Sequence, residues 1–241
     1  MTDHIALVSG GKDSTAMLIL LAEKGTRLDY VVFNNTGIEF PETVYFVRKE
    51  LNAFVKEHFG IEITEIHPEK SFGEYVQQYG VPHVPYGRWC CRVLKEEPFR
   101  KWLAERFAGQ EVMLYYGYSA DEPQRVKSAK EKELPKKYKV KAQIETPLYD
   151  AGIGEEDALR LCKDYGLLNP VYEKGFKRTG CYLCPFQPLR SWRLLWSEYP
   201  QLWRTATTLE KYSIQKKQRG FFIGRTLKDL EKKFKDQKGG A

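Results

Sequence analysis

Long hydrophobic runs are absent from this sequence. No stretch of about 18 apolar residues occurs, so no segment is long enough to cross a membrane as a helix. The residues from Met1 to His4 lead directly into a short apolar run, without the basic segment or cleavage site of a secretory leader. We therefore expect a cytoplasmic protein that does not associate with membranes.

Cysteine is scarce, and its odd count fits a disulfide framework poorly. The chain has five cysteines, of which two are adjacent, two are spaced C-x-x-C and one is isolated: Cys90, Cys91, Cys181, Cys184 and Cys162. In a reducing compartment, thiols at such spacings are more typical of a metal site than of disulfides. The cysteines therefore indicate metal binding.

Positive charge is concentrated in two stretches. The formal net charge is +7, and the range Lys127 to Lys141 contains seven lysines against two glutamates. The range Lys216 to Lys238 contains nine basic against three acidic residues. Such stretches favour a polyanionic partner, but they are equally typical of a solvated loop and a solvated terminal helix. The charge alone does not decide between these interpretations.

The order of the predicted elements indicates an α/β fold with one substantial core. The chain has 241 residues, is 42% hydrophobic and is 14% aromatic, which excludes overall disorder. Apolar runs predict strands at residues 5–8, 28–33, 62–66 and 112–118. Helical spacing predicts helices at residues 15–24, 42–58 and 155–165. Strands and helices in this order build a parallel sheet with right-handed crossovers.

Two further regions have their own predicted conformations. We expect the lysine-rich stretch from Lys127 to Lys141 to be a mobile loop. From Leu189 onward the pattern predicts helices that are interrupted at Pro200 and Gly220.

A glycine-rich turn joins the first predicted strand to the first predicted helix. It runs from Ser9 to Ser14 and reads SGGKDS. Glycines let the backbone approach a phosphate, and the free N–H groups at the helix start bind anions. Lys12 adds a positive charge and the serines add hydroxyl donors. The Walker spacing G-x-x-x-x-G-K-[ST] is absent, so this is a phosphate site of another kind.

This turn resembles the phosphate loop of the PP-loop superfamily, which includes ATP pyrophosphatases and sulfonucleotide reductases with a Rossmann-like adenine nucleotide alpha hydrolase fold. The resemblance implies that the nucleotide, either ATP with Mg²⁺ or adenylyl sulfate, is bound by Ser9, Gly10, Gly11, Lys12, Asp13 and Ser14. A second signature, from Phe33 to Glu42, implies that Asn34, Thr36 and Gly37 lie near the adenosine. Polar residues in a turn often only form the turn, which is the alternative here.

The two cysteine segments form a second constellation. The segment from Arg88 to Lys95 contains Cys90 and Cys91, and Cys181 and Cys184 follow Gly180. This combination resembles the 4Fe-4S-binding pattern of the assimilatory adenylyl-sulfate reductases. Four thiolates also suit a structural zinc ion, although adjacent cysteines are awkward for most zinc folds, and uninvolved thiols are the third interpretation.

Basic residues flank the adjacent cysteines. Arg88, Arg92 and Lys95 would offset the negative charge of a thiolate-bound cluster or face a substrate phosphate, and ordinary surface charge is the alternative. Cys162 lies in an apolar helix stripe, so we interpret it as a core residue, with a sulfur-carrier role as the alternative.

The resemblance extends over residues 4–205. The segment from Gly117 to Arg125 is similar to the family segment G-x-R-x-x-E-S-x-x-R, and Asn169 to Tyr172 match its N-P-x-Y turn, after a strand expected at Pro147. The chain is identified as a member of the phosphoadenylyl-sulfate reductase-like family, which also contains ATP pyrophosphatases that insert sulfur into DNA backbones. We assign residues 1–188 to a PP-loop domain with the cysteine segments, and residues 189–241 to a basic helical extension.

Two departures separate this chain from the reductases. The reductases carry a catalytic cysteine in a C-terminal E-C-G-L-H motif, whereas no cysteine follows Cys184 here. Ser119 stands where the reductase pattern has an arginine, which weakens the case for a sulfate group at that position. Arg125 does match the pattern, so an anion site is still expected there.

These features favour a PP-loop ATP pyrophosphatase that adenylates a target for 4Fe-4S-dependent sulfur insertion, as in DNA phosphorothioation. The resemblance implies catalytic roles for Lys12, Arg125 and Arg92, which would stabilise the charged transition state. A partner cysteine desulfurase would deliver the sulfur as a persulfide. The expected target is nucleic acid, DNA or tRNA, held by the basic stretches.

Three tryptophans near the C-terminus are candidates for base stacking: Trp192, Trp196 and Trp203. Tryptophan at helical spacing is more often part of a core, which is the alternative.

Two other functions stay open. One is an adenylyl-sulfate or phosphoadenylyl-sulfate reductase that releases sulfite with a thiol from another chain, such as thioredoxin. The other is a nucleotide-sensing scaffold without turnover, which would bind nucleotide and leave it unchanged.

Overall fold

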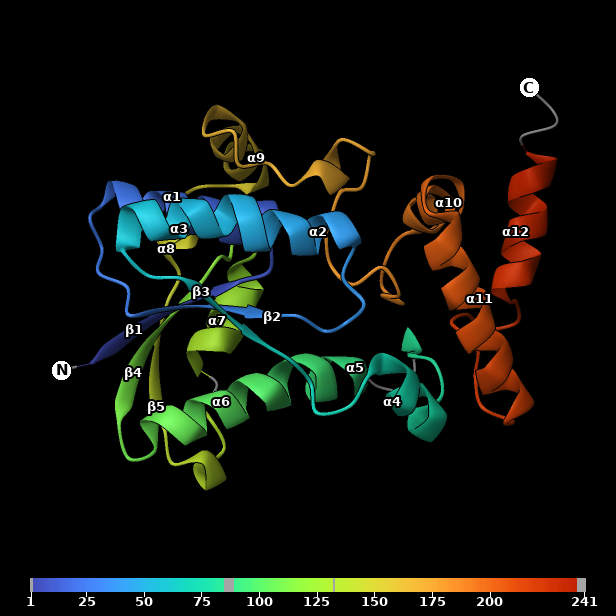
Figure 1. Cartoon of the computed structure of the whole chain (residues 1–241), viewed down its shortest axis with the longest axis horizontal. Coiled ribbons are helices and arrows are strands. Elements are labelled where there is room, and N and C mark those ends of the chain that lie inside the picture. The colour runs from blue at the N-terminus through green and yellow to red at the C-terminus, as the bar shows by residue number, and fades with distance from the viewer. Residues whose placement is uncertain (1, 85–88, 132, 238–241) are drawn as a thin grey trace.

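The strands form one parallel sheet in the part of the chain that the computed structural model describes, residues 2–84, 89–131 and 133–237 (Figure 1). Its five strands are β1 (Asp3–Val8), β2 (Tyr30–Asn34), β3 (Ile63–Ile66), β4 (Glu111–Tyr116) and β5 (Lys141–Glu145). They lie in the order β3-β2-β1-β4-β5, and each pairing is parallel, with Ile5 opposite Tyr30 and Leu114. The predicted α/β class with a parallel sheet is confirmed.

The central strand β1 is apolar because helices cover both faces of the sheet. Ile5 packs into a core cluster with residues of α6 (Glu97–Phe107), whereas Ala6 and Val8 pack into a cluster with residues of α1 (Lys12–Glu23). On one side of β1 lies β2, which follows it in sequence, and on the other lies β4. The carboxyl ends of β1 and β4 therefore flank the switch point at which open α/β sheets bind ligands.

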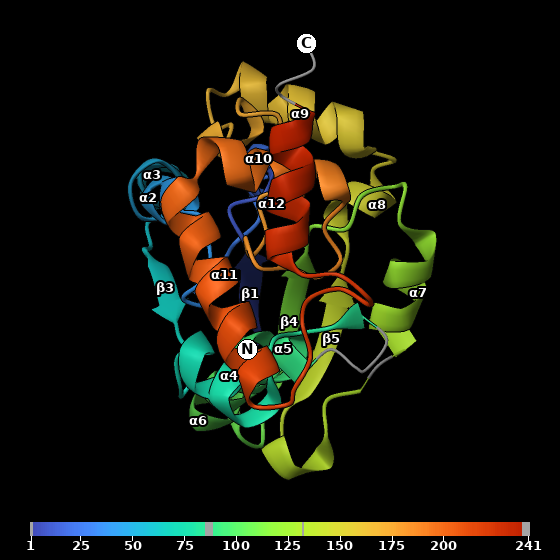
Figure 2. The ribbon, with the colours of Figure 1, turned by 90° about the vertical axis from the view of Figure 1, so that its right-hand side faces the viewer.

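The helices lie in two layers (Figure 1). One layer contains α1 (Lys12–Glu23), α2 (Pro41–Phe46), α3 (Asn52–Phe59), α8 (Pro147–Asp150) and α9 (Glu155–Asp164). The other layer contains α6 (Glu97–Phe107), and α7 (Pro123–Glu131) lies beside the edge strand β5 (Figure 2). The helix predicted at residues 42–58 is α2 and α3 joined by a π-helical segment, Val47–Leu51.

The lysine-rich stretch is a loop only in its middle part. Helix α7 ends at Glu131, a 3₁₀ turn spans Lys136–Tyr138, and β5 begins at Lys141; residue 132 lies outside the described residues. The buried side chain of Val126 anchors α7, and β5 pairs with β4. These long-range contacts fix the two ends of the stretch as helix and strand, whereas residues 133–135 and 139–140 lie outside helices and strands, as expected for a loop. The strand expected at Pro147 is also displaced: β5 ends at Glu145, and Pro147 starts α8, since proline favours the first helical position.

Three helices follow residue 188: α10 (Leu189–Glu198), α11 (Pro200–Gln215) and α12 (Leu227–Asp236) (Figure 2). The breaks predicted at Pro200 and Gly220 are confirmed, since Pro200 starts α11 and Gly220 lies between α11 and α12. In Figure 1 the strands run from the labelled N-terminus toward these helices, so α10 to α12 stand at the carboxyl edge of the sheet. No helix in the described ranges is both long enough and apolar enough to span a bilayer.

The C-terminal helices share a core with residues from the rest of the chain. Trp192 and Trp203 are buried there, together with Val76 of α4 (Phe72–Tyr79) and Leu183. The core interpretation of these two tryptophans is confirmed, and stacking on bases was the wrong expectation for them because their rings are not accessible. Trp196 is partly buried against the same cluster.

Candidate nucleotide and thiol site

The phosphate loop lies at the carboxyl end of β1 and is closely packed at both of its glycines. Gly10 has a φ of +71°, and a Cβ there would lie 2.8 Å from the Val47 side chain. A Cβ on Gly11 would lie 3.2 Å from the Thr179 hydroxyl. The loop is therefore packed closely against the segments around it, and its backbone N–H groups can approach a ligand that side chains would keep away.

Residues from a later part of the chain hold the loop backbone. The Asn169 side-chain amide donates to Gly10 O at 2.8 Å, and the Lys12 backbone N–H donates to the Tyr172 hydroxyl at 2.9 Å. The Cys162 thiol donates to Lys12 O at 3.2 Å. Asn169 and Tyr172 belong to the N-P-x-Y turn, for which the sequence suggested a family match but no role. Its role in the structure is to fix the loop.

The ammonium group of Lys12 is held by two carboxylates. It lies 2.7 Å from Asp13 and 3.3 Å from Glu155, and the side chain is only 8% exposed. Burial lowers the pKa of Lys12, but the bond to Asp13 and the nearby carboxylates raise it above the ordinary lysine value. Burial raises the pKa of Asp13, and the charges of Glu155 and Glu122 add to this effect against the opposing charge of Lys12. The surroundings of Lys12 are thus rich in negative charge.

The end of β4 packs directly on the start of α1. A Cβ on Gly117 would lie 2.7 Å from the backbone O of Asp13, so only glycine fits. The guanidinium of Arg125 lies 4.6 Å from the centre of the Tyr118 ring and pairs with Glu122. The Arg125 side chain is 61% exposed, so it stays accessible to a ligand at this edge.

The predicted adenosine turn after β2 contacts the thiol region. The Asn34 side chain donates to Lys95 O at 2.8 Å, and Gly37 N–H donates to Asn35 Oδ1 at 3.0 Å with Gly37 at a φ of +77°. The Thr36 hydroxyl donates to Glu39 at 2.8 Å and lies 3.4 Å from the Cys181 sulfur. This turn therefore links β2 to the cysteines, whatever contact it makes with a nucleotide.

The four predicted metal ligands come from two segments. Cys90 and Cys91 lie in α5 (Trp89–Cys91), which continues into a π-helical segment, Arg92–Glu96. The other segment is a tight turn, in which Cys184 N–H donates to Cys181 O at 3.0 Å. A bond of 3.0 Å from Tyr182 N–H to Ile38 O attaches this turn to the one after β2. Cys90 and Cys181 pack against the same core cluster.

Burial and nearby charged groups raise the pKa values of the Cys90 and Cys181 thiols. Burial, together with the neighbouring Cys184 and Cys91, raises the pKa of Cys90 to about 11. Burial and the nearby carboxylate of Glu39 raise the pKa of Cys181 to about 12. The ammonium of Lys95 donates to Cys181, and the thiol, Glu39 and Cys91 raise its pKa although burial opposes this shift. The ammonium of Lys95 therefore lies near thiols of both cysteine segments, Cys91 of one and Cys181 of the other.

The four thiols are not arranged as a complete metal-binding site. In the described part of the chain, no group of three or more His, Cys, Asp or Glu side chains is placed to hold a metal ion. Two buried polar atoms lie beside them without a hydrogen-bond partner among the described residues, Asn34 Oδ1 and Trp89 Nε1. The donors suit a thiolate-bound cluster, and binding would require the thiols to lose protons and draw together.

The remaining predicted residues lie as follows. Arg92 is half exposed and pairs with Glu97 at 2.7 Å, so its catalytic role remains a prediction. Arg88 lies outside the described residues. Cys162 is fully buried, which agrees with the core interpretation. Glu39 was missed by the sequence reasoning; the only signal was an acidic residue inside a turn signature.

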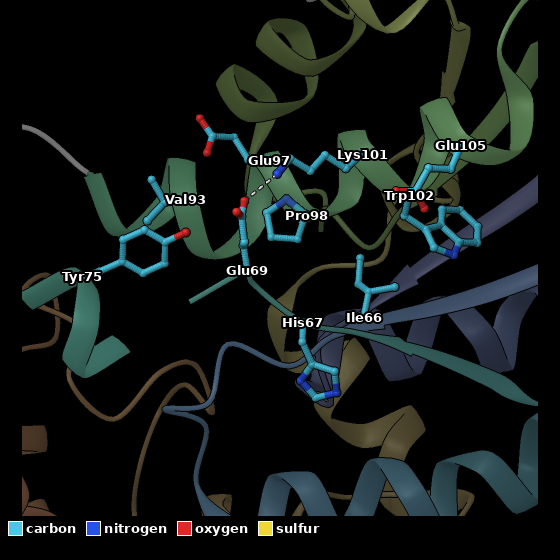
Figure 3. A pocket seen from close by; sticks show the side chains of 10 residues that line it. All are labelled: Ile66, His67, Glu69, Tyr75, Val93, Glu97, Pro98, Lys101, Trp102 and Glu105. Carbon is cyan, nitrogen blue, oxygen red and sulfur yellow. Dashed lines mark hydrogen bonds and ion pairs between the residues drawn. The ribbon is translucent and has the colours of Figure 1, made fainter. Parts of the chain in front are cut away.

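A separate cavity lies between β3, α4 and α6 (Figure 3). Its volume is about 350 Å³, and its lining includes Glu69, Glu97 and Glu105. Lys101 spans part of it and pairs with Glu69 at 2.7 Å. None of the predicted site residues lines this cavity, and its acidic wall does not suit a phosphate.

Comparisons with known proteins agree with the fold. Residues 3–187 match the family described as phosphoadenosine phosphosulfate reductase domain. The chain is similar to two proteins of Methanocaldococcus jannaschii. MJ0066 is 34% identical over 197 residues, which cover 81% of this chain and 38% of the relative. MJ0973 is 30% identical over 237 residues, which cover 95% of this chain and 53% of the relative. The chain thus spans about half or less of these relatives' length.

A solved structure shares the fold at low sequence identity. The phosphoadenylyl-sulfate reductase from Candida auris, in a phosphate complex, superposes with a TM-score of 0.52 and 16% identity. The match covers 76% of this chain and 83% of that chain.

Proposed function

Since the chain belongs to the phosphoadenosine phosphosulfate reductase domain family, we propose that it is a PP-loop ATP pyrophosphatase that adenylates a nucleic-acid target for sulfur insertion. DNA phosphorothioation is the reaction of this type that the sequence resemblance favours, and a partner cysteine desulfurase would supply the sulfur.

The negative charge around Lys12 is the observation that supports ATP with Mg²⁺ as the substrate. Asp13 and Glu155 lie within ion-pair distance of the Lys12 ammonium, and Glu122 is close enough to raise the pKa of Asp13. These carboxylates repel a bare anion such as adenylyl sulfate. They suit a nucleotide that arrives with Mg²⁺, which prefers oxygen ligands and phosphates. Ser119, where the reductases have an arginine, is fully buried and offers no contact to a sulfate group.

The chain's own residues account for the first step. The backbone of Ser9 to Ser14 would hold the phosphates of ATP at the start of α1, and Lys12 would turn from the carboxylates to the leaving group. A target oxygen attacks the α-phosphorus, the bond from that phosphorus to the β-phosphate oxygen breaks, and pyrophosphate leaves. Arg125 is accessible at the same edge and would stabilise the extra negative charge.

The thiol region would hold a 4Fe-4S cluster on Cys90, Cys91, Cys181 and Cys184. Lys95 would offset the negative charge of the ligated thiolates, since it already donates to Cys181. When bound, the cluster would supply iron that can take up sulfur beside the adenylated target. Its position next to the turn after β2 supports a role near the nucleotide.

A reductase is the second candidate, and the accessible Arg125 beside Tyr118 favours it, because this cation can bind a sulfonucleotide. In that case a dithiol such as thioredoxin would reduce the substrate to sulfite. A scaffold that binds nucleotide without turnover is the third candidate.

One preparation distinguishes these candidates. The full chain is purified anaerobically, assayed for iron and sulfide, and incubated with ATP and Mg²⁺, with and without DNA or tRNA, for pyrophosphate release. The same sample is given adenylyl sulfate and its 3′-phosphorylated form with reduced thioredoxin, and sulfite is measured. Pyrophosphate that depends on Lys12 supports the proposal, with Lys56→Ala as the control on the exposed face of α3. Sulfite release would establish the reductase, and nucleotide binding without either product would establish the scaffold.

A further inference from the structure

The connection between α11 and α12, residues 216–226, is anchored to a buried carboxylate. Glu210 is 3% exposed and accepts hydrogen bonds from Phe221 N–H at 3.0 Å and Leu227 N–H at 2.6 Å. A Cβ on Gly220 would lie 2.9 Å from the same carboxylate. The base of this loop, which we call the 216–226 loop, therefore has a defined conformation.

The 216–226 loop is also attached to the segment that leads to the adjacent cysteines. His83 Nδ1 donates to Gly220 O at 2.8 Å, and the Ser213 hydroxyl donates to Arg219 O at 2.6 Å while it accepts from Val81 N–H at 3.1 Å. The buried ring of Phe221 belongs to the core cluster against which Cys90 and Cys181 pack. The loop base and the thiol region thus share one packed unit.

The tip of the loop presents an apolar residue among basic ones. Ile223 is 73% exposed, the highest exposure of a large hydrophobic side chain in the described residues. The guanidinium of Arg225 lies 5.0 Å from the centre of the Phe222 ring, and these two residues flank Ile223 and Gly224 in the sequence. Lys216 and Lys217 begin the same loop.

Internal contacts occupy the acidic residues that follow the loop. Asp229 caps α12 by accepting from Thr226 N–H at 2.8 Å, and Glu231 accepts from Trp203 Nε1 at 3.3 Å and pairs with Lys235 at 2.7 Å. Lys216, Lys217 and Arg225 of the loop are exposed, and basic residues outnumber acidic ones by nine to three from Lys216 to Lys238. Such a surface is complementary to a polyanion.

We propose that the 216–226 loop binds the nucleic-acid target and places it beside the thiol region. Ile223 and the Phe222–Arg225 pair would pack against unstacked bases, as apolar wedges and arginine planes do in other complexes, while the lysines contact phosphates. This inference rests on the proposed function, because it names the site for the target of that reaction. The nine basic against three acidic residues from Lys216 to Lys238 are complementary to the phosphates of a nucleic acid.

The test measures binding of fluorescein-labelled oligonucleotides of about 20 residues, single-stranded DNA, single-stranded RNA and duplex DNA, to the anaerobically purified full chain. Arg225→Ala should weaken single-strand binding about tenfold and reduce the slope of log affinity against log salt by about one. Ile223→Ser should weaken binding roughly fivefold without changing that slope, since it removes apolar contact alone. The DNA and RNA arms identify the natural target.

Two matched variants control for general effects. Arg106→Ala removes another arginine that lies on an aromatic ring, 4.9 Å from the centre of Trp102, and Tyr45→Ser removes another exposed apolar side chain. Both should bind as the unmodified chain does, and thermal melting confirms that all variants are folded. Equal binding by the loop variants and the controls, or no binding by the unmodified chain, would overturn the inference. Pyrophosphate release from ATP and Mg²⁺, measured on the same samples without nucleic acid, tests the proposed function separately from binding at the loop.

Discussion

The phosphate loop and the thiol region lie at the same edge of the sheet, but different contacts hold them. The loop is one continuous segment, Ser9 to Ser14, and its backbone is bonded by the side chains of Asn169 and Tyr172. The thiols come from two segments far apart in the sequence, and Cys90 and Cys181 are placed chiefly by packing against a hydrophobic cluster. The first site depends on backbone geometry, and the second depends on side-chain packing.

This difference shows what each site needs before its ligand binds. A phosphate site made of N–H groups works only if the backbone is already fixed, and here the loop is supported on several sides. A thiolate site changes its own charge when it binds metal. The raised pKa values of Cys90 and Cys181 keep these thiols protonated at neutral pH until a metal displaces the protons. The two sites should therefore fail independently when they are altered.

The cysteine replacements test this independence with the largest expected effect. Changing any of Cys90, Cys91, Cys181 or Cys184 to serine should remove nearly all iron, because a cluster of this type needs its thiolates. ATP binding should be retained in each variant. Iron and sulfide per chain, measured after anaerobic purification, check the first statement, and calorimetric titration with ATP checks the second.

Cys162→Ala is the matched control for the cysteine replacements, since it removes the buried thiol outside the two segments and should retain iron. Loss of iron from this variant, or full iron in a serine variant, would contradict the assignment. Zinc in place of iron would establish the zinc interpretation.

The complementary change is in the phosphate loop. Lys12→Ala should slow pyrophosphate release by roughly 100- to 1,000-fold, as removal of one charged donor at a reacting centre typically does. Iron content should not change. Pyrophosphate is measured at saturating ATP, with Lys56→Ala as a control for loss of a lysine that pairs at an exposed site. An equal loss in both variants would refute a specific role for Lys12.

Gly117→Ala should disturb the loop through backbone packing alone. The added Cβ would lie 2.7 Å from Asp13 O and 2.8 Å from Ser14 Cα, and these are backbone atoms that cannot rotate away. We expect a loss of about 1–3 kcal/mol in the free energy of unfolding, with weaker ATP binding. Urea unfolding provides the measurement. Gly73→Ala, in α4 with its nearest contact at 3.9 Å, should instead be neutral or slightly stabilising.

Tyr172→Phe should give the smallest effect of these changes. It removes the acceptor of the Lys12 N–H bond and should cost about 1 kcal/mol in the free energy of unfolding, because that N–H then lacks a partner. Tyr165→Phe deletes a hydroxyl that donates to Glu23 at an exposed site, and water replaces that bond. If the two variants have equal stability, the N-P-x-Y turn does not support the loop as inferred.

The sequence predicted the parts of the molecule that short-range patterns encode. The strand, turn and helix around Ser9 to Ser14 are predictable because apolar spacing and glycine have local meanings. The loop predicted at Lys127 to Lys141 is correct only for the middle of that range, because the burial of Val126 and the pairing of β5 with β4 are long-range effects that fix its two ends. The stacking role of Trp192 failed for the same reason, since burial is decided by what packs around the ring.

By itself, the sequence determined the α/β class, the phosphate loop and the identity of the candidate thiol ligands, because each follows from short local patterns of residues. Only the tertiary structure decided which groups surround them. It placed Glu155 beside Lys12, Tyr172 under the loop backbone and Lys95 among the thiols. Such contacts join residues that are distant in sequence, and they form only when the sheet order and the packing of the helices bring those residues together.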